Sequence, residues 1–132
     1  MSDRRFIKEV NLLLEDVDIT DNTEKQTTHV NGYSTNKCCL LVETTSHGNP
    51  NAISIDVQIS PDAPTNDNIR WFNLQNHDFL PANWTAAECA DTAREAFYFD
   101  LPASRARITY TGSGCDSDNY FTVSLWLLTY SY

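Results

Sequence analysis

Residues 53–60 read ISIDVQIS, and the strict alternation of apolar and polar side chains in this stretch decides the fold class. A repeat of two residues places the two kinds of side chain on opposite faces of a β-strand. Pro61 and Asp62 end the strand, because proline lacks the amide N–H that a sheet needs and aspartate favours turns. The apolar set is expected to form one wall of a core: Ile53, Ile55, Val57 and Ile59.

Outside this stretch, several other short segments have the composition of strands. We expect a first strand over 9–20, with Val10, Leu12 and Leu14 on one face and a bulge or an edge position near Glu15, where the apolar pattern changes parity. One short helix at most is expected, beginning at Thr85, where Glu88 completes a capping box. The remaining expected strands cover 38–45, 69–74, 94–101, 106–111 and 120–132.

These strands, closely spaced and with at most one helix, predict an all-β fold. We expect an antiparallel β-sandwich, jelly-roll-like, of about seven or eight strands. The length of 132 residues matches the commonest size of a single domain. Residues 1–9 are expected to form an N-terminal arm, and residues 10–132 the sandwich.

The charge distribution limits the classes of partner. The chain has 18 acidic residues against 9 Lys and Arg, a formal net charge of −9. Such a surface repels phosphate backbones, so nucleic acid is not an expected partner. No apolar run reaches the roughly 18 residues of a membrane span, so no membrane association is expected. The first ten residues, MSDRRFIKEV, lack the apolar segment of a secretory signal, and we expect folding in a cytosol.

The sequence contains no recognisable catalytic or cofactor motif. The GSG at 112–114 has neither the G-x-S-x-G spacing of a nucleophile elbow nor the GxxxxGK[ST] spacing of a phosphate-binding loop. His29, His47 and His77 fall in expected loops, far apart in the sequence, and nothing pairs any of them with a nucleophile. We therefore expect no enzymatic activity and no cofactor.

The cysteines show no zinc pattern such as CxxC. Cys38 and Cys39 are adjacent on an expected strand, so at most one of them faces the core. We expect buried free thiols at these two positions and at Cys89 and Cys115. The turn CDSDN at 115–119 is rich in the oxygen donors that calcium prefers, but it lacks the Gly and Glu of an EF-hand loop. Asp and Asn also favour turns through their own hydrogen bonds, so no metal site is assigned.

The last expected strand, 120–132, is apolar on both of its faces. One face carries Phe121, Val123, Leu125 and Leu127, and the other carries Trp126, Leu128, Tyr130 and Tyr132. An antiparallel strand with one face in water normally has a polar face. The second apolar face is therefore covered either by another segment of this chain or by another copy of it.

The order of features from residue 53 onward resembles a pattern found in small virion proteins of tailed bacteriophages. In that pattern an alternating strand ends in a Ser-x-Asp turn, a strand containing Trp follows, and an aromatic strand precedes an alternating strand rich in Arg. The corresponding pieces are VQISPD (57–62), IRWFNL (69–74), AFYFDLPASRARITYTG (96–112) and the apolar last strand. Discoidin-like and galactose-binding-like sandwiches share much of the same pattern, so the sequence is also similar to theirs.

The resemblance implies a capsid decoration (cement) protein that stabilises the head of the virion by bridging capsomers. Its partners would be the major capsid protein or other virion proteins, and it would be a homo-oligomer, with a trimer favoured. We expect the arm to contact neighbouring subunits by strand addition and through its basic residues. The candidate interface residues are Arg4, Arg5, Phe6, Lys8, Trp126, Leu128, Tyr130 and Tyr132.

The alternative is a carbohydrate-binding β-sandwich module on a viral fibre or a secreted protein. Exposed tryptophans stack on sugar rings, and the candidates for that role are Trp71 and Trp84.

Overall fold

The computed structural model of the chain describes residues 6–31, 37–61, 69–74, 82–100 and 105–131. Ten strands lie within these ranges, and no helix does. The strands are β1 (Phe6–Ile19), β2 (Lys25–Gln26), β3 (Val30–Asn31), β4 (Lys37–His47), β5 (Ala52–Ser60), β6 (Phe72–Asn73), β7 (Ala82–Thr85), β8 (Ala93–Asp100), β9 (Arg105–Ser113) and β10 (Tyr120–Ser131).

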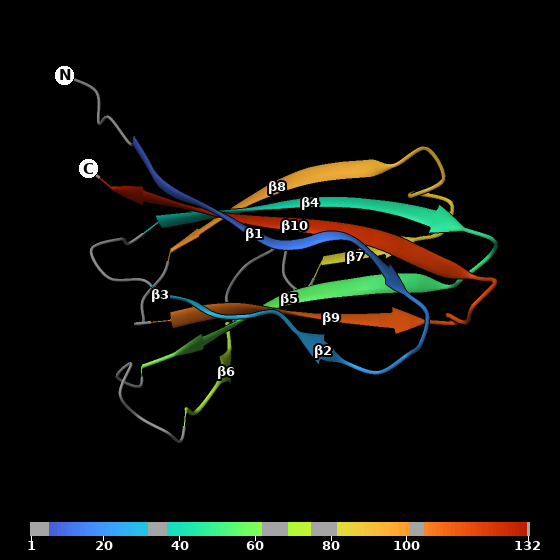
Figure 1. The fold of residues 1–132 in the computed structure, drawn as a ribbon, viewed down its shortest axis with the longest axis horizontal. Helices are drawn as coiled ribbons and strands as arrows, with labels where there is room; N and C mark the ends of the chain where they lie inside the picture. Colours follow the sequence, from blue (N-terminus) through green and yellow to red (C-terminus); the bar gives the residue numbers. More distant parts are fainter. Residues whose placement is uncertain (1–5, 32–36, 62–68, 75–81, 101–104, 132) are drawn as a thin grey trace.

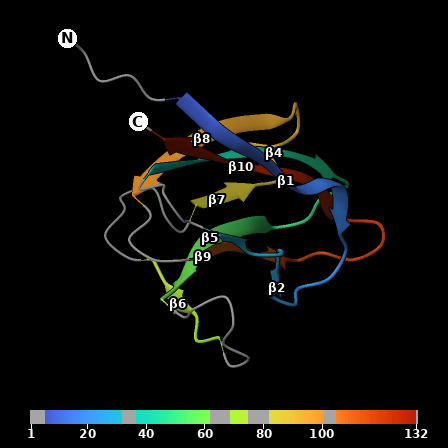
Figure 2. The same ribbon diagram turned by 60° about the vertical axis from the view of Figure 1, so that its left-hand side comes forward.

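The strands form two sheets that pack face to face, as Figures 1 and 2 show. Sheet A has the order β1-β10-β4-β8. Sheet B has the order β2-β9-β5-β6, and in addition β3 pairs with β9 and β7 pairs with β5. Every pairing is antiparallel. The prediction of an all-β antiparallel sandwich is confirmed.

The core lies between the sheets and is built from the inward-facing rows of the long strands. The β10 side chains that face sheet B are fully buried: Phe121, Val123, Leu125 and Leu127. Opposite them, β5 contributes Ile53, Ile55 and Val57, which are also fully buried, while Ile59 is partly buried and packs against the same cluster. The alternating stretch ISIDVQIS is therefore one wall of the core, as predicted.

β1 is an edge strand whose pairing with β10 is irregular. Its register shifts at three points, two of them between Leu12 and Val17. Asp16, within the last shift, has a φ of 47°, in the left-handed region that non-glycine residues rarely occupy. A bulge inserts an extra residue and bends the strand locally. The predicted irregularity near Glu15 is confirmed, and so is the predicted edge position.

The shift between Leu12 and Leu14 overturns one detail of the prediction. The sequence pattern placed Val10, Leu12 and Leu14 on one face of the first strand. In the structure Val10 and Leu12 point outward and are exposed, whereas Leu14 and Val17 pack against the core. The inserted residue turns Leu14 inward, because side chains alternate with a period of two, and the next shift, before Val17, restores the original alternation.

Three other expectations need correction. Residues 6–9, expected in the arm, belong to β1 and pair with β10, and residues 1–5 of that arm lie outside the described residues. The expected strand over 69–74 contributes only the two residues of β6. At Thr85 the capping box forms, since Thr85 N–H donates to Glu88 Oε1 at 3.1 Å and Glu88 N–H donates to Thr85 Oγ1 at 3.4 Å. The segment that follows is a turn and not a helix.

Replacing Ile55 by Ala tests the assignment of the core wall. Ile55 is fully buried, so the truncation leaves a cavity and should lower the free energy of unfolding by about 2–5 kcal/mol, measured by urea denaturation. The matched control is Ser54→Ala, one position away on the outward face of β5, which should change it by less than about 0.5 kcal/mol. Equal effects of the two variants would contradict the inward orientation of Ile55.

Candidate interaction surface

The outer face of sheet A, which faces away from the core, is divided into an apolar half and a polar half. Cross-strand pairing aligns the outward side chains in rows that run from β1 through β10 and β4 to β8. The apolar half consists of Ile7 and Tyr130, of the row Val10–Leu128–Cys39–Tyr98, and of the row Leu12–Trp126–Leu41–Ala96.

Large apolar side chains of the apolar half are exposed to solvent. Ile7 is 55% exposed, Val10 61%, Leu12 50% and Tyr98 61%. Soluble proteins seldom leave contiguous apolar surface uncovered unless it serves for binding. Within the part of the chain that the structure describes, the second apolar face of the last strand is only partly covered: Leu128 is buried, whereas Trp126 and Tyr130 are partly exposed.

A shallow hollow of about 600 Å³ lies in the apolar half where it meets the polar half. Its apolar lining includes Val10 from β1, Trp126 from β10 and Leu41 from β4. Glu43 and Arg94 border it on the polar side. The hollow therefore offers an indole and aliphatic groups next to an ion pair.

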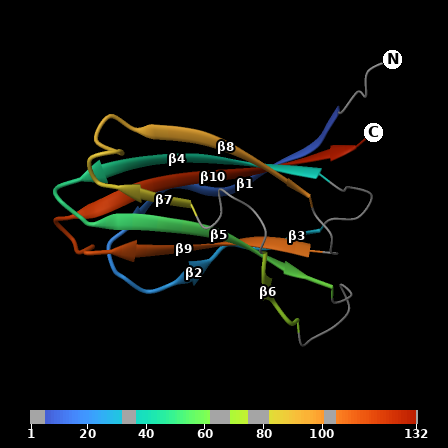
Figure 3. The same ribbon diagram turned by 180° about the vertical axis from the view of Figure 1, so that it is seen from behind.

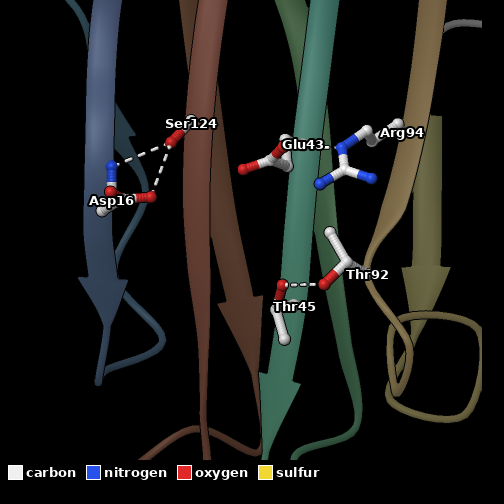
Figure 4. A network of polar contacts seen from close by, with 6 residues as sticks. All are labelled: Asp16, Glu43, Thr45, Thr92, Arg94 and Ser124. Atoms are coloured by element: carbon white, nitrogen blue, oxygen red, sulfur yellow. Dashed lines mark hydrogen bonds and ion pairs between the residues drawn. The ribbon is translucent and has the colours of Figure 1, made fainter.

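The polar half continues the same face toward the other end of the strands. The polar half consists of the six residues that Figure 4 shows: Asp16, Glu43, Thr45, Thr92, Arg94 and Ser124. Asp16 N–H donates to Ser124 Oγ at 2.8 Å, and this hydroxyl donates back to Asp16 Oδ1 at 3.2 Å. Arg94 Nε donates to Glu43 Oε2 at 2.7 Å. These bonds hold both edge strands to the centre of the sheet, so the polar half is an ordered border to the apolar half.

The thiol of Cys39 lies on the outer face under two tyrosines. Cys39 is only 1% exposed, and the rings of Tyr98 and Tyr130 lie 6.3 Å apart between centroids. Burial raises the pKa of Cys39, and hydrogen bonds from the two tyrosines oppose that change. Burial raises the pKa of Tyr130 to about 12. At neutral pH the Cys39 thiol and the Tyr130 hydroxyl are therefore protonated and uncharged.

The structure brings three of the predicted interface residues together. Trp126, Leu128 and Tyr130 all project from β10 onto the apolar half, although Leu128 is only 9% exposed. Phe6 and Lys8 belong to β1. The other three predicted interface residues, Arg4, Arg5 and Tyr132, lie outside the described residues.

The two predicted sugar-stacking tryptophans occupy different environments. Trp84 is 3% exposed, its ring meets Phe97 edge to face, and its indole N–H donates to Glu95 Oε1 at 3.0 Å. A sugar ring has no access to Trp84, so this candidate is wrong. Trp71 is half-buried on sheet B, where the guanidinium carbon of Arg107 lies 4.3 Å from its ring centroid.

Sequence reasoning missed the contributions of β1, β4 and β8 to the apolar half. Val10 and Leu12 were visible as an alternating pair, but only the register shift shows that they face outward. Leu41 and Tyr98 stood in segments that read as ordinary core strands. Their alignment with Trp126 and Leu128 depends on pairing partners far apart in the sequence.

The oxygen-rich turn at 115–119 is occupied by its own hydrogen bonds. Asp116 Oδ1 accepts from Asp118 N–H at 2.9 Å, from Asn119 N–H at 2.8 Å and from Asn119 Nδ2 at 3.0 Å. These bonds, chiefly the one from Asp118, hold the pKa of Asp116 below its usual value. Among the described residues, no three His, Cys, Asp or Glu side chains are grouped so as to hold a metal ion. No helix in the same ranges has the length and apolar character to cross a bilayer.

All four cysteines are free and buried, as the sequence predicted. Burial raises the pKa of Cys38 to about 12, with a smaller contribution from neighbouring Cys39. Burial also raises the pKa values of Cys89 and Cys115. None of these thiols is a reactive nucleophile at neutral pH, since the thiolate is the reactive form.

No protein-family model matches the sequence, and no curated protein matches it by sequence. Solved structures that align with this chain include the following three. A chain of dimeric latent PorU from Porphyromonas gingivalis aligns with a TM-score of 0.52 and 7% identity over 93% of this chain, which spans 12% of that chain. The N-terminal cellulose-binding domain of β-1,4-glucanase C from Cellulomonas fimi aligns with a TM-score of 0.50 and 12% identity, covering 83% of this chain and 68% of that one.

The third is a chain from the acid-stable capsid of Helicobacter pylori bacteriophage KHP30, with a TM-score of 0.48, 10% identity and coverage of 95% of this chain and 91% of that one. At these identities the similarity concerns the fold alone.

The raised thiol pKa values predict a loss of stability in alkali. Native Cys38 holds its proton more tightly than an unfolded thiol of pKa 9.0. Its contribution to stability is therefore complete below pH 9.0 and is lost as the pH rises toward about 12. We expect the free energy of unfolding, measured by urea denaturation in steps through this range, to fall less steeply in Cys38→Val than in the wild type. Identical slopes would contradict the prediction.

Proposed function

We propose that the chain is a non-enzymatic structural protein of a bacteriophage virion, a capsid decoration (cement) protein that bridges capsomers through the apolar half of sheet A. One observation carries the proposal: a contiguous apolar surface on which Ile7, Val10, Leu12 and Tyr98 are each at least half exposed. A protein that works by assembly needs a surface of this kind, and it needs no catalytic group.

The composition of the face suits a protein partner. Covering the exposed parts of Ile7, Val10 and Leu12 is worth on the order of 1 kcal/mol each, since full burial of such a side chain contributes about twice that. Trp126 and Tyr98 are the residue types that most often dominate binding energy at the centre of an interface. The polar half matches the polar rim that surrounds such a centre.

The partners in this proposal are the major capsid protein or other virion proteins, and further copies of the chain in a trimer. The resemblance of the sequence pattern to small virion proteins of tailed phages supports the location in a virion. The net charge of −9 supports a place away from packaged nucleic acid.

Leu12→Glu tests the apolar half as an interface between copies. Leu12 lies on the outward face of an edge strand, so the variant should fold normally by circular dichroism. We expect light scattering over a dilution series to give a trimer for the wild type and at least about tenfold weaker association for the variant, because the interface would bury an unpaired carboxylate.

The control is Thr111→Glu, which adds the same charge on the outward face of sheet B and should leave the native mass unchanged. A wild type that stays monomeric at every concentration would contradict self-association through this face. Equal masses for Leu12→Glu and an oligomeric wild type would show that other surfaces hold the oligomer.

The second candidate function is carbohydrate binding, and the hollow beside Trp126 favours it. The indole of Trp126 lines the hollow next to Glu43 and Arg94, which combines an aromatic surface with hydrogen-bonding groups. Sugar recognition needs both, because the apolar face of a sugar ring stacks on an aromatic ring while its hydroxyls form hydrogen bonds.

A panel of soluble glycans, including cello-oligosaccharides, tests this candidate through tryptophan fluorescence. Binding in the hollow should change the emission of the wild type and leave that of Trp126→Phe unchanged or much less affected. Trp84 is buried and serves as the internal reference that does not respond. An absence of any fluorescence change across the panel would contradict carbohydrate binding in the hollow.

A further inference from the structure

The outward face of sheet B carries a row of polar side chains that the assembly surface does not use. Asn73 of β6 pairs with Gln58 of β5, and Gln58 pairs with Arg107 of β9, so the three lie side by side across three strands. Their neighbours Val57 and Ile108 face the core, which places the row on the outside. Figures 1 and 3 show β6 beside β5 on the side of the molecule away from sheet A.

The hydrogen bonds within this row fix the direction of every amide. Arg107 Nε donates to Gln58 Oε1 at 2.8 Å, and an arginine can only donate. Gln58 Nε2 must then face Asn73, where it donates to Asn73 Oδ1 at 3.1 Å. Both amide oxygens are therefore used inside the row, and the row presents N–H groups to any ligand.

The guanidinium of Arg107 is held in place on a second side. Its carbon lies 4.3 Å from the ring centroid of Trp71, within the distance of a cation–π contact. The ring of His29, from the segment on the other side of β9, lies 6.0 Å from that of Trp71. Within the described parts of the chain, the terminal nitrogens Nη1 and Nη2 make no hydrogen bond. They form the planar pair of donors that binds a carboxylate through two parallel bonds.

Acidic side chains stand next to the row of donors. Asp56 precedes Gln58 by two residues on the same face of β5. Burial raises the pKa of Asp56, opposed by a hydrogen bond from Val57 N–H and reinforced by the charge of Glu24. Glu24 also attracts Arg107. A ligand at Arg107 would thus meet carboxylate acceptors within the same surface, which suits a molecule that has hydroxyl donors as well as a negative charge.

We propose that this surface binds the carboxylate of an acidic saccharide, such as a uronic acid at the end of a glycan. Arg107 Nη1 and Nη2 bind the carboxylate, and the amides of Gln58 and Asn73 extend the set of donors. Sugar hydroxyls donate to Asp56 and Glu24, and the half-buried indole of Trp71 supplies apolar contact. A simple carboxylate would not use the acidic groups, and a neutral sugar would not use the guanidinium.

This inference does not depend on the proposed assembly function, because that surface lies on the other sheet. The two can therefore fail separately: variants of Arg107 leave the apolar half of sheet A intact, and variants of Leu12 leave the donor row intact.

Nuclear magnetic resonance titration of the full chain tests the site directly. The probes are sodium glucuronate, glucose and sodium acetate, each at constant ionic strength through the millimolar range. We expect glucuronate to cause saturable shifts of the Trp71 indole, Gln58 amide and Asn73 amide signals, and the other two probes to bind at least about tenfold more weakly.

Two variants and a control sharpen the test. Arg107→Gln should weaken glucuronate binding by about tenfold or more, because it removes the charged pair of donors. Glu24→Gln should strengthen it by about twofold to fivefold, since the glutamine oxygen can still accept a bond from a sugar hydroxyl while the negative charge that competes for Arg107 is removed. Arg94→Gln, which removes a charge of the same kind on sheet A, should leave binding unchanged.

Four outcomes would overturn the proposal. Unshifted Trp71, Gln58 and Asn73 signals with glucuronate would remove the site. Wild-type affinity for glucuronate in Arg107→Gln would contradict the role assigned to the guanidinium. Weaker glucuronate binding in Glu24→Gln would contradict the claim that the negative charge of Glu24 competes with the ligand. Acetate binding as tight as glucuronate binding would overturn the assignment to a saccharide.

Discussion

The register of β10 between β1 and β4 is the constraint on which the rest of the structure depends. β10 pairs along its length with β4, and this pairing places Phe121 through Leu127 alternately in the core and on the outside. A slip of one residue would send Trp126 into the core and Leu125 into water. The fully buried inner row fixes the register, and the fixed register in turn aligns the outer rows that form the apolar half.

The two register shifts on either side of Leu14 turn one more apolar side chain of β1 into the core. Val10 and Leu12 face outward and Val17 and Ile19 face inward, as a regular alternation would also place them. The same alternation would put Leu14 outside, whereas in the structure it packs against the core. The bonds between Asp16 and Ser124 hold the second shift to β10, so the regular alternation resumes at a defined place.

The sequence predicted the elements whose side chains alternate over six or more residues, because a period of two is visible without knowing the partner strand. It could not predict β2, β3 or β7, since two to four residues are too few to show a period. The burial of Trp84 and the stacking of Trp71 on Arg107 depend on segments that meet only in the folded chain. The candidate surfaces on both sheets were likewise hidden, although β10 alone indicated that an apolar outer face exists.

For the proposed assembly, the irregular edge of sheet A also has a consequence for how copies of the protein would meet. A straight, unpaired edge invites a further strand and then another, which leads to open-ended fibres. The three register shifts of β1 break the regular spacing of amide and carbonyl groups along that edge. Contact through the face of the sheet is then favoured over extension of the sheet. A molecule with an exposed apolar face beside an irregular edge strand is suited to closed complexes of fixed stoichiometry.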